Sequence, residues 1–201
     1  MFKIAVLAST NGTDLQAIID EMKAGKMEGI ELTCVLSYKE CKAIERAKEA
    51  GYDARVLGSK FDSREKFEIA AKNILKEKGV DLVCLIGYMR ILSDWFIDEF
   101  DMKIINVHPA IDMEKYGGEG FFGGNVHKAV LEAGEKETGC TIHYVTKEVD
   151  AGPPIDSEEV EILPNDTVGT LKDKVQACEK RLYPEVIRKI AKGEYVMKLR
   201  L

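Results

Sequence analysis

The first half of the chain alternates short apolar segments with amphipathic ones. The apolar segments predict strands at residues 2–8, 31–37, 53–57, 80–87 and 104–108. The amphipathic segments predict helices at residues 14–23, 41–50, 61–78 and 93–100. The 80–87 segment is almost wholly apolar, which is typical of a strand buried on both faces of a parallel sheet. Strands and helices that alternate in this way build parallel sheets through right-handed crossovers.

The second half of the chain changes this pattern. Residues 141–145 alternate as a strand, and residues 160–162 predict a last strand antiparallel to its neighbour. Residues 167–190 predict a long helix interrupted near Pro184. A chain of 201 residues is long enough to bury a large core. We therefore expect residues 1–201 to form a single α/β domain: a Rossmann-like, mostly parallel twisted sheet with helices on both faces and one antiparallel strand near the C-terminal part.

Residues 103–109, Lys-Ile-Ile-Asn-Val-His-Pro, place two polar side chains at the end of a predicted strand. Side chains alternate faces along a strand, so Asn106 and His108 point the same way. Pro109 lacks a backbone N–H and ends the strand, which puts both residues at its carboxyl end. An amide beside an imidazole suits the binding of a carbonyl oxygen that becomes negative during a reaction. The alternative for so short a motif is a capping Asn and a hydrogen-bonded, half-buried His.

Two further loops follow predicted strands. Residues 9–13, Ser-Thr-Asn-Gly-Thr, lead into the first helix, where free N–H groups and the helix dipole can bind an anion. An ordinary capped turn is the alternative, because the chain has neither G-x-G-x-x-G nor a Walker lysine there. Residues 89–92 follow the 80–87 strand. Ligands of parallel sheets bind outside the carboxyl ends of the strands, so we expect these loops and residues 106–108 to line one crevice.

A glycine-rich loop at residues 116–124 surrounds two adjacent aromatic residues and predicts a mobile flap. His127 lies on the helix predicted after this loop, and we expect it at the surface or against a loop. His143 lies within the 141–145 strand, where the alternation favours a structural role.

Three polar residues of the second half are further candidates for a site. Residues 148–154 predict a turn that carries Asp150 and ends at a rigid proline stop. Gln176 and Glu179 lie three residues apart on the long helix, so they face the same way. Solvent exposure is the competing interpretation for this pair.

Composition limits the classes of protein to which the chain can belong. The net charge of −6 gives no indication of nucleic-acid binding, and no apolar run approaches the roughly 18 residues of a membrane span. The five cysteines are odd in number and lack C-x-x-C spacing, and no signal peptide is present. We therefore expect reduced thiols in a cytoplasmic protein. The three histidines include no pair at i, i+4, so we expect no metal site.

Six motifs follow one another along the chain in a recognisable order. They are Gly-Thr-Asp-Leu-Gln at 12–16, Phe-Asp-Ser-Arg at 61–64, Gly-Tyr-Met-Arg-Ile-Leu at 87–92, Asn-Val-His-Pro at 106–109, Val-Asp-x-Gly-Pro at 149–153, and Val-Gln-x-x-Glu with Tyr-Pro at 175–184. By these motifs nearly the whole chain resembles the phosphoribosylglycinamide formyltransferase family, folate-dependent enzymes of purine biosynthesis. The ordered set is far more specific than any one motif.

The resemblance implies transfer of a formyl group from 10-formyltetrahydrofolate, a co-substrate, to the amine of glycinamide ribonucleotide. The catalytic residues it implies are Asn106, His108 and Asp150. The ribonucleotide-binding residues it implies are Gly12, Thr13, Asp14, Gln176 and Glu179. The folate-binding residues it implies are Arg64, Met89, Arg90, Ile91, Leu92 and Asn106. The implied partners are these small molecules, with no nucleic acid and no membrane, and the implied assembly is a monomer or homodimer.

In the implied mechanism the substrate amine attacks the formyl carbon, and Asn106 with protonated His108 stabilises the oxyanion. Asp150 favours the charged form of His108 and organises a water that relays the amine proton to the leaving nitrogen. Asp14 departs from the Asn usual in the family, and a carboxylate repels phosphate. Its other possible roles are as the helix N-cap or as partner of a ribose hydroxyl. The 110–124 loop also departs from the family's usual sequence.

Other interpretations stay open at this point. The first is a formyltetrahydrofolate hydrolase, or a formyltransferase that acts on a different amine. We expect neither the extra N-terminal domain usual in the hydrolase nor the extra C-terminal domain of the transfer-RNA enzyme. The second is a non-catalytic folate- or nucleotide-binding module, but such a module has no need of Asn106, His108 and Asp150 together.

Overall fold

The computed structural model describes residues 1–58 and 63–194. The elements in this part of the chain are, in order, β1 (Phe2–Ala8), α1 (Thr13–Lys23), β2 (Ile30–Ser37), α2 (Lys42–Glu49), β3 (Ala54–Val56), α3 (Arg64–Lys78), β4 (Leu82–Ile86), α4 (Asp94–Glu99), β5 (Ile104–His108), α5 (Met113–Tyr116), α6 (Gly124–Glu132), β6 (Glu137–Tyr144), β7 (Pro154–Glu161) and α7 (Val168–Ala191). Their alternation in the first half follows the predicted order of strands and helices.

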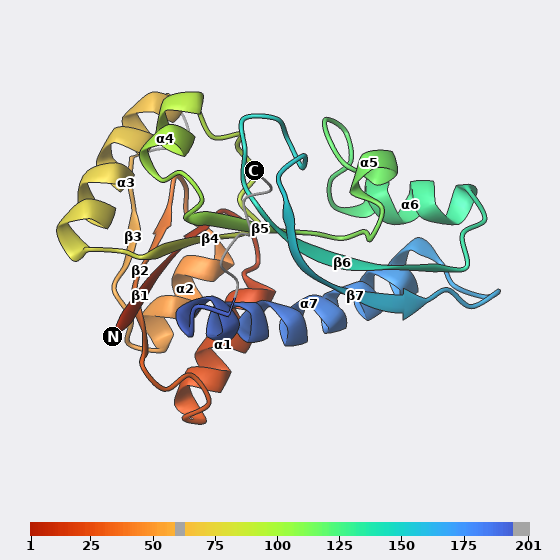
Figure 1. Ribbon diagram of the computed structural model, residues 1–201, viewed down its shortest axis with the longest axis horizontal. Helices are drawn as coiled ribbons and strands as arrows, with labels where there is room; N and C mark the ends of the chain where they lie inside the picture. Colours follow the sequence, from red (N-terminus) through yellow and green to blue (C-terminus); the bar gives the residue numbers. More distant parts are fainter. Residues whose placement is uncertain (59–62, 195–201) are drawn as a thin grey trace.

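The described strands form one seven-stranded sheet in the order β3-β2-β1-β4-β5-β6-β7 (Figure 1). The pairs β3–β2, β2–β1, β1–β4 and β4–β5 are parallel. Strand β6 is antiparallel to both of its neighbours, β5 and β7. The prediction of a mostly parallel sheet with one antiparallel strand near the C-terminal part is confirmed.

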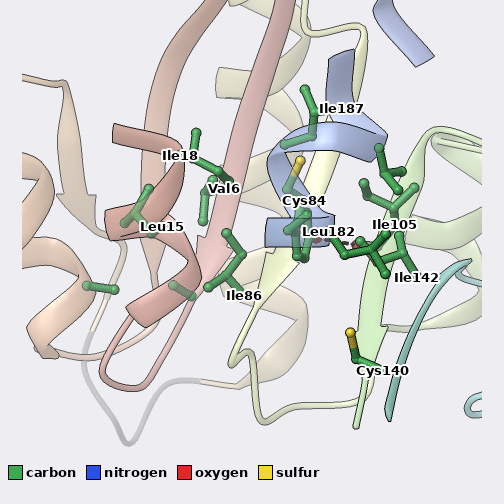
Figure 2. Packing of buried hydrophobic residues seen from close by; sticks show 14 of the residues in the cluster. Val6, Leu15, Ile18, Cys84, Ile86, Ile105, Cys140, Ile142, Leu182 and Ile187 are labelled. Atoms are coloured by element: carbon green, nitrogen blue, oxygen red, sulfur yellow. Dashed lines mark hydrogen bonds between the residues drawn. The ribbon is translucent and has the colours of Figure 1, made fainter. Parts of the chain in front are cut away.

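Helices cover both faces of the sheet because the side chains of its strands alternate. In β1, Ile4, Val6 and Ala8 face one core, and Ala5 and Leu7 face the other. The first core contains apolar residues of α1, α2, α6 and α7, and Figure 2 shows part of it. The second contains apolar residues of α3 and α4, which lie together on the opposite side of the sheet in Figure 1. All five cysteines are free thiols.

The ends of α3 show how local chemistry sets the boundaries of a helix. The Ser63 side chain accepts a hydrogen bond from the backbone N–H of Lys66, which satisfies one of the unpaired donors of the first turn. Gly79 ends the helix with φ 65°, a conformation that glycine adopts without steric cost. Phe61 and Asp62, the first two residues of the Phe-Asp-Ser-Arg motif, lie outside the described residues.

The prediction that the last helix is interrupted near Pro184 is wrong. Helix α7 continues through Pro184 to Ala191. Proline removes the hydrogen bond to the carbonyl four residues earlier, which weakens an isolated helix. Here the residues around it, Leu182, Tyr183 and Val186, are buried in the core, and their packing holds the helix in place.

Two elements near the glycine-rich loop also differ from the prediction. Pro154 is not a stop but the first residue of β7, a position where proline is tolerated because its missing N–H is not needed. A short helix, α5, precedes the loop, and the Asp112 side chain caps it by accepting from the N–H of Lys115. The predicted flap therefore starts after α5, at Gly117.

Tyr183 links helix α7 to the centre of the sheet, and its loss should lower stability. The fully buried hydroxyl lies 3.1 Å from the Leu85 carbonyl oxygen and 3.2 Å from that of Ile105. We expect Tyr183→Phe to lower the free energy of unfolding by about 1–2 kcal/mol, because it removes a buried donor. Urea unfolding with an unchanged m-value measures this. Tyr52→Phe is the control, since the Tyr52 hydroxyl only approaches the Met22 sulfur, at 3.6 Å. Equal losses in both variants would contradict the expectation.

Candidate active site

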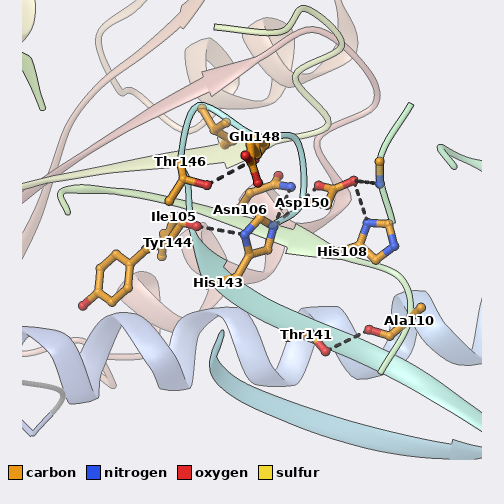
Figure 3. A network of polar contacts seen from close by, with 12 residues as sticks. Ile105, Asn106, His108, Ala110, Thr141, His143, Tyr144, Thr146, Glu148 and Asp150 are labelled. Carbon is orange, nitrogen blue, oxygen red and sulfur yellow. Dashed lines mark hydrogen bonds and ion pairs between the residues drawn. The ribbon is translucent and has the colours of Figure 1, made fainter. Parts of the chain in front are cut away.

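Strands β5 and β6 and the loop after β6 bring four polar side chains together at one end of the sheet (Figure 3). Asn106 pairs across the two strands with His143. The Asn106 Nδ2 atom lies 3.3 Å from His143 Nε2. Asp150, in the loop between β6 and β7, has one oxygen 3.3 Å from His108 Nδ1 and the other 3.7 Å from His143 Nε2. The three residues that the sequence singled out as catalytic candidates thus lie together, with His143 as a fourth member.

Both ring nitrogens of His108 face hydrogen-bond acceptors. Its Nε2 lies 2.7 Å from the carbonyl oxygen of Tyr116, which can only accept. Its Nδ1 faces the Asp150 carboxylate. The ring is 2% exposed. A geometry with an acceptor at each nitrogen suits the doubly protonated, positively charged imidazole, and a buried charge of this kind needs such a partner.

Asp150 is held in an unusual backbone conformation beside His108. Its φ of 55° lies in the left-handed region, which Asp tolerates better than most residues. Burial raises the pKa of its carboxyl, but the hydrogen bond and charge of His108 and the N–H of Gly118 outweigh burial and hold the pKa below its ordinary value. The Gly118 N–H donates to Asp150 Oδ2 over 3.1 Å. The first residues of the predicted flap therefore contact the ionised carboxylate directly.

His143 fixes the orientation of the Asn106 amide. Its Nδ1 lies 2.9 Å from the Tyr144 carbonyl oxygen and must donate to it. Burial lowers the pKa of His143, although the Tyr144 carbonyl and Asp150 act in the opposite direction. In the neutral ring Nε2 then carries no proton and accepts from Asn106. One N–H of the amide is used in this way, and its second N–H can serve a ligand.

The structure adds detail to the expectations about two histidines. His143, for which the alternation favoured a structural role, contacts both Asn106 and Asp150. It reaches the site because β6 runs antiparallel beside β5, a register that no local sequence pattern specifies. His127 was expected at the surface or against a loop, and the surface position is wrong: it is 3% exposed, because α6 packs against α7. Burial, with the charges of Lys172 and His108, lowers the pKa of His127 to about 4.

The loop before α1 is shaped around Gly12. Its φ is 64°, and a Cβ atom there would lie 2.6 Å from the Cβ of Ala43, so only glycine fits. Gly12 is itself the N-cap of α1, and Thr13 begins the helix. Asp14 is therefore not the N-cap, which corrects one of its two alternative roles. Its side chain is instead buried.

Helix α7 places Glu179 against α1. Glu179 is buried and Gln176 is half-buried, so solvent exposure is the wrong interpretation for Glu179. The Asp14 charge acts on Glu179 and helps to raise its pKa, after the larger effect of burial. Two of the residues implied to bind the ribonucleotide thus meet where α1 packs against α7.

The segment after β4 connects two of the predicted loops. The Ser9 hydroxyl lies 2.9 Å from the Gly87 carbonyl oxygen and accepts from the Met89 N–H over 3.0 Å. Arg64, at the start of α3, donates to the Ile91 carbonyl oxygen over 3.2 Å. The loops that follow β1 and β4 are therefore joined, and Arg64 lies beside the second of them.

The side chains of residues 89–92 have different surroundings. Met89 and Ile91 are large apolar residues that remain half-exposed, which suits contact with a ligand. Leu92 is buried in the core under α3 and α4. The Arg90 guanidinium lies 3.9 Å from the centre of the Tyr38 ring. The structure therefore leaves Met89 and Ile91 as the accessible apolar side chains of this segment.

Within residues 1–58 and 63–194, no cluster of three or more His, Cys, Asp or Glu side chains could hold a metal ion. No helix in the same ranges is both long and apolar enough to cross a membrane.

Comparisons with known proteins agree with one another. The phosphoribosylglycinamide formyltransferase of Escherichia coli is 35% identical over 195 residues, which cover 96% of this chain and 89% of that protein. The crystal structure of glycinamide ribonucleotide transformylase 1 from Symbiobacterium toebii superposes with a TM-score of 0.89 at 38% identity and covers 100% of this chain and 92% of that one.

A longer relative and a family model complete the comparison. The trifunctional purine biosynthetic protein adenosine-3 of Gallus gallus is 40% identical over 193 residues. This match covers 95% of the present chain but only 18% of that protein, so the chain corresponds to less than a fifth of it. The family model for formyl transferase matches residues 2–187. The chain belongs to the formyl transferase family.

Proposed function

We propose that this protein transfers the formyl group of 10-formyltetrahydrofolate to the amine of glycinamide ribonucleotide, a step of purine biosynthesis. The observation that carries the proposal is the convergence of Asn106, His108 and Asp150 at the end of β5, with His108 between two acceptors. The similarity to the Escherichia coli phosphoribosylglycinamide formyltransferase over nearly the whole chain supports the choice of acceptor.

The first chemical step is attack of the neutral acceptor amine on the formyl carbon. The carbonyl oxygen becomes an oxyanion, and donors already in place can stabilise it without reorganisation. The Tyr116 carbonyl holds the Nε2 edge of His108, so the Nδ1 edge is the one turned toward Asp150 and the reaction. The second N–H of Asn106 then donates to the oxyanion, and His108, whose Nδ1 faces Asp150, stabilises it through its positive charge.

The second step moves a proton from the attacking amine to the leaving nitrogen of the folate. Asp150 is ionised, because its pKa lies below the ordinary value. Its side chain is 12% exposed, so a water molecule can reach it. Asp150 orients that water, which takes the proton from the amine and delivers one to the folate nitrogen as the tetrahedral intermediate breaks down.

The two substrates occupy different sides of the cluster. Gly12, Thr13 and Asp14 with Gln176 and Glu179 bind the ribonucleotide, where the N-terminus of α1 suits its phosphate. Arg64 and residues 89–92 bind the folate, with Met89 and Ile91 offering apolar surface. Holding both substrates in one geometry supplies much of the remaining acceleration.

The glycine-rich segment 117–124 is proposed to close over the folate and exclude water during transfer. The Gly118 N–H already contacts Asp150, so movement of this segment changes the surroundings of the catalytic carboxylate. The protein is further proposed to act as a single cytoplasmic domain, as a monomer or homodimer, without nucleic acid, membrane or metal.

A product assay tests the proposed function. The protein is incubated with 10-formyltetrahydrofolate, with and without glycinamide ribonucleotide, and the formylated ribonucleotide is identified by mass spectrometry. We expect tetrahydrofolate to form only when the ribonucleotide is present. Release of formate at the same rate without any acceptor would identify a hydrolase. Formylation of a different amine only would overturn the choice of acceptor.

A further inference from the structure

Two buried acidic side chains lie on helices α1 and α7, which pack against each other. Asp14, in the first turn of α1, is 5% exposed, and Glu179, on α7, is 8% exposed. The charge of Asp14 acts directly on Glu179. Two carboxyl groups that share a buried site cannot both be ionised without a large cost, because each charge is poorly solvated and repels the other.

One atom of this pair lacks a partner. The Oδ1 atom of Asp14 is buried and makes no hydrogen bond with any described residue. A buried acceptor without a donor costs free energy, and a carboxylate has no proton of its own to offer. A proton placed on one of the two carboxyls turns that group into a donor and leaves the buried site with one negative charge instead of two.

The pKa values of both carboxyls are raised, as expected for a pair that holds a proton. Burial raises the pKa of Asp14 to about 6, although the charge of Lys180 and a hydrogen bond with Thr13 act in the opposite direction. Burial, and then the charge of Asp14, raises the pKa of Glu179 well above its ordinary value. Their titrations are therefore properties of the pair and not of either residue alone.

Among the described residues, the positive charges that act on the pair offset its burial only in part. The titratable side chains that act on the pair are Lys172, Cys178, Lys180 and Tyr183 of α7. The helices that pack against α1 and α7 carry two more, Arg46 on α2 and His127 on α6. Both lysines are exposed, so water and salt screen them. Arg46 is held by Gln16 and by the Asn11 carbonyl oxygen. The lowered pKa of His127 keeps it neutral.

We propose that Asp14 and Glu179 hold one proton between them and that the acceptor binds to this singly protonated form. The inference rests on the proposed function, which places the acceptor's phosphate and sugar beside these residues. A phosphate monoester carries nearly two negative charges at neutral pH and is repelled less by one carboxylate than by two. Bound acceptor therefore makes the proton harder to remove, and acceptor affinity falls as the pH rises through the titration of the pair.

The first test needs no ligand and measures stability between pH 5 and 8.5. The folded protein holds a proton that the unfolded chain releases, so stability rises as the pH falls through the folded-state pKa. This proton raises the folding equilibrium constant by up to about tenfold for each unit by which the pH falls. Asp14→Asn and Glu179→Gln should each reduce the gain, and the double variant should lose it.

Asp173→Asn is the matched control, because it removes an exposed acid from the same helix. It should keep the pH dependence of the wild type. The same pH dependence in the wild type, Asp14→Asn and Glu179→Gln would overturn the proposal. Two isosteric variants on different helices make the test independent of the folding of either one.

The second test measures the dissociation constant of glycinamide ribonucleotide by calorimetry between pH 6.5 and 8.5. Titration of the ligand itself affects the wild type and Asp14→Asn equally. The dissociation constant of the wild type divided by that of Asp14→Asn therefore reports on the carboxyl pair alone. This ratio should rise with pH by up to about tenfold per unit. A ratio that does not change with pH would contradict the proposal. Failure of the proposed function would appear differently, as a wild type that binds no ribonucleotide at any pH while the stability difference persists.

Discussion

His108→Ala is expected to slow formyl transfer at saturating substrate by on the order of 10²–10³-fold or more, as loss of one oxyanion donor does in other enzymes. The substrate oxygen becomes fully charged only as the tetrahedral intermediate forms. A charged donor therefore stabilises the transition state more than it stabilises the bound substrates. Folate and ribonucleotide affinities should therefore change little. Single-turnover rates and equilibrium binding on the same variant measure the two effects separately.

His108→Asn is the matched control for charge. The Asn amide nitrogen can take the place of Nδ1 and still donate a hydrogen bond, but it carries no positive charge. We expect its rate to fall between those of the wild type and His108→Ala. The competing view is that His108 only shapes the pocket. A His108→Ala protein that binds folate tenfold more weakly yet transfers at the wild-type rate would support that view.

Asp150→Asn is expected to give the second large effect, a loss of turnover on the order of 10²-fold, because it removes both the partner of His108 and the group that orients the water. The lowered pKa keeps Asp150 ionised throughout the neutral range, so the loss should be present across it and not only in acid. Rate measurements from pH 6 to 8 check this. A variant impaired only below pH 6 would contradict the assignment.

The double variant His108→Ala with Asp150→Asn tests whether the two residues act as a unit. The Asp150 carboxylate lies 3.3 Å from His108 Nδ1, so removal of one residue disables much of what the other does. We expect the double variant to be little slower than His108→Ala alone. Losses that multiply fully would mean that Asp150 acts independently of His108.

The position of the catalytic candidates on β5 could be predicted because it depends only on local rules. An apolar run predicts the strand, its period of two puts Asn106 and His108 on one face, and Pro109 ends it. The strand has the predicted bounds. The end of α3 at Lys78 was predicted for the same reason, since it is set by Gly79, the next residue in the sequence.

What the sequence could not supply depends on contacts between distant segments. His143 enters the site only because β6 runs antiparallel beside β5, and no local pattern specifies that register. Pro184 fails to interrupt α7 because the helix is buried against the sheet. In the sequence alone, Glu179 could be an exposed residue of the long helix. Only the packing of α1 on α7 shows that it is buried.

The measurement that tests the account most directly is a single turnover with donor labelled in the formyl group, quenched at short times in the wild type and in Asn106→Ala. We expect the label to pass to the amine of glycinamide ribonucleotide in the wild type, and to remain on the folate in Asn106→Ala at times when the wild-type transfer is complete. Label released as formate by the wild type, or transferred at the wild-type rate by Asn106→Ala, would contradict the account.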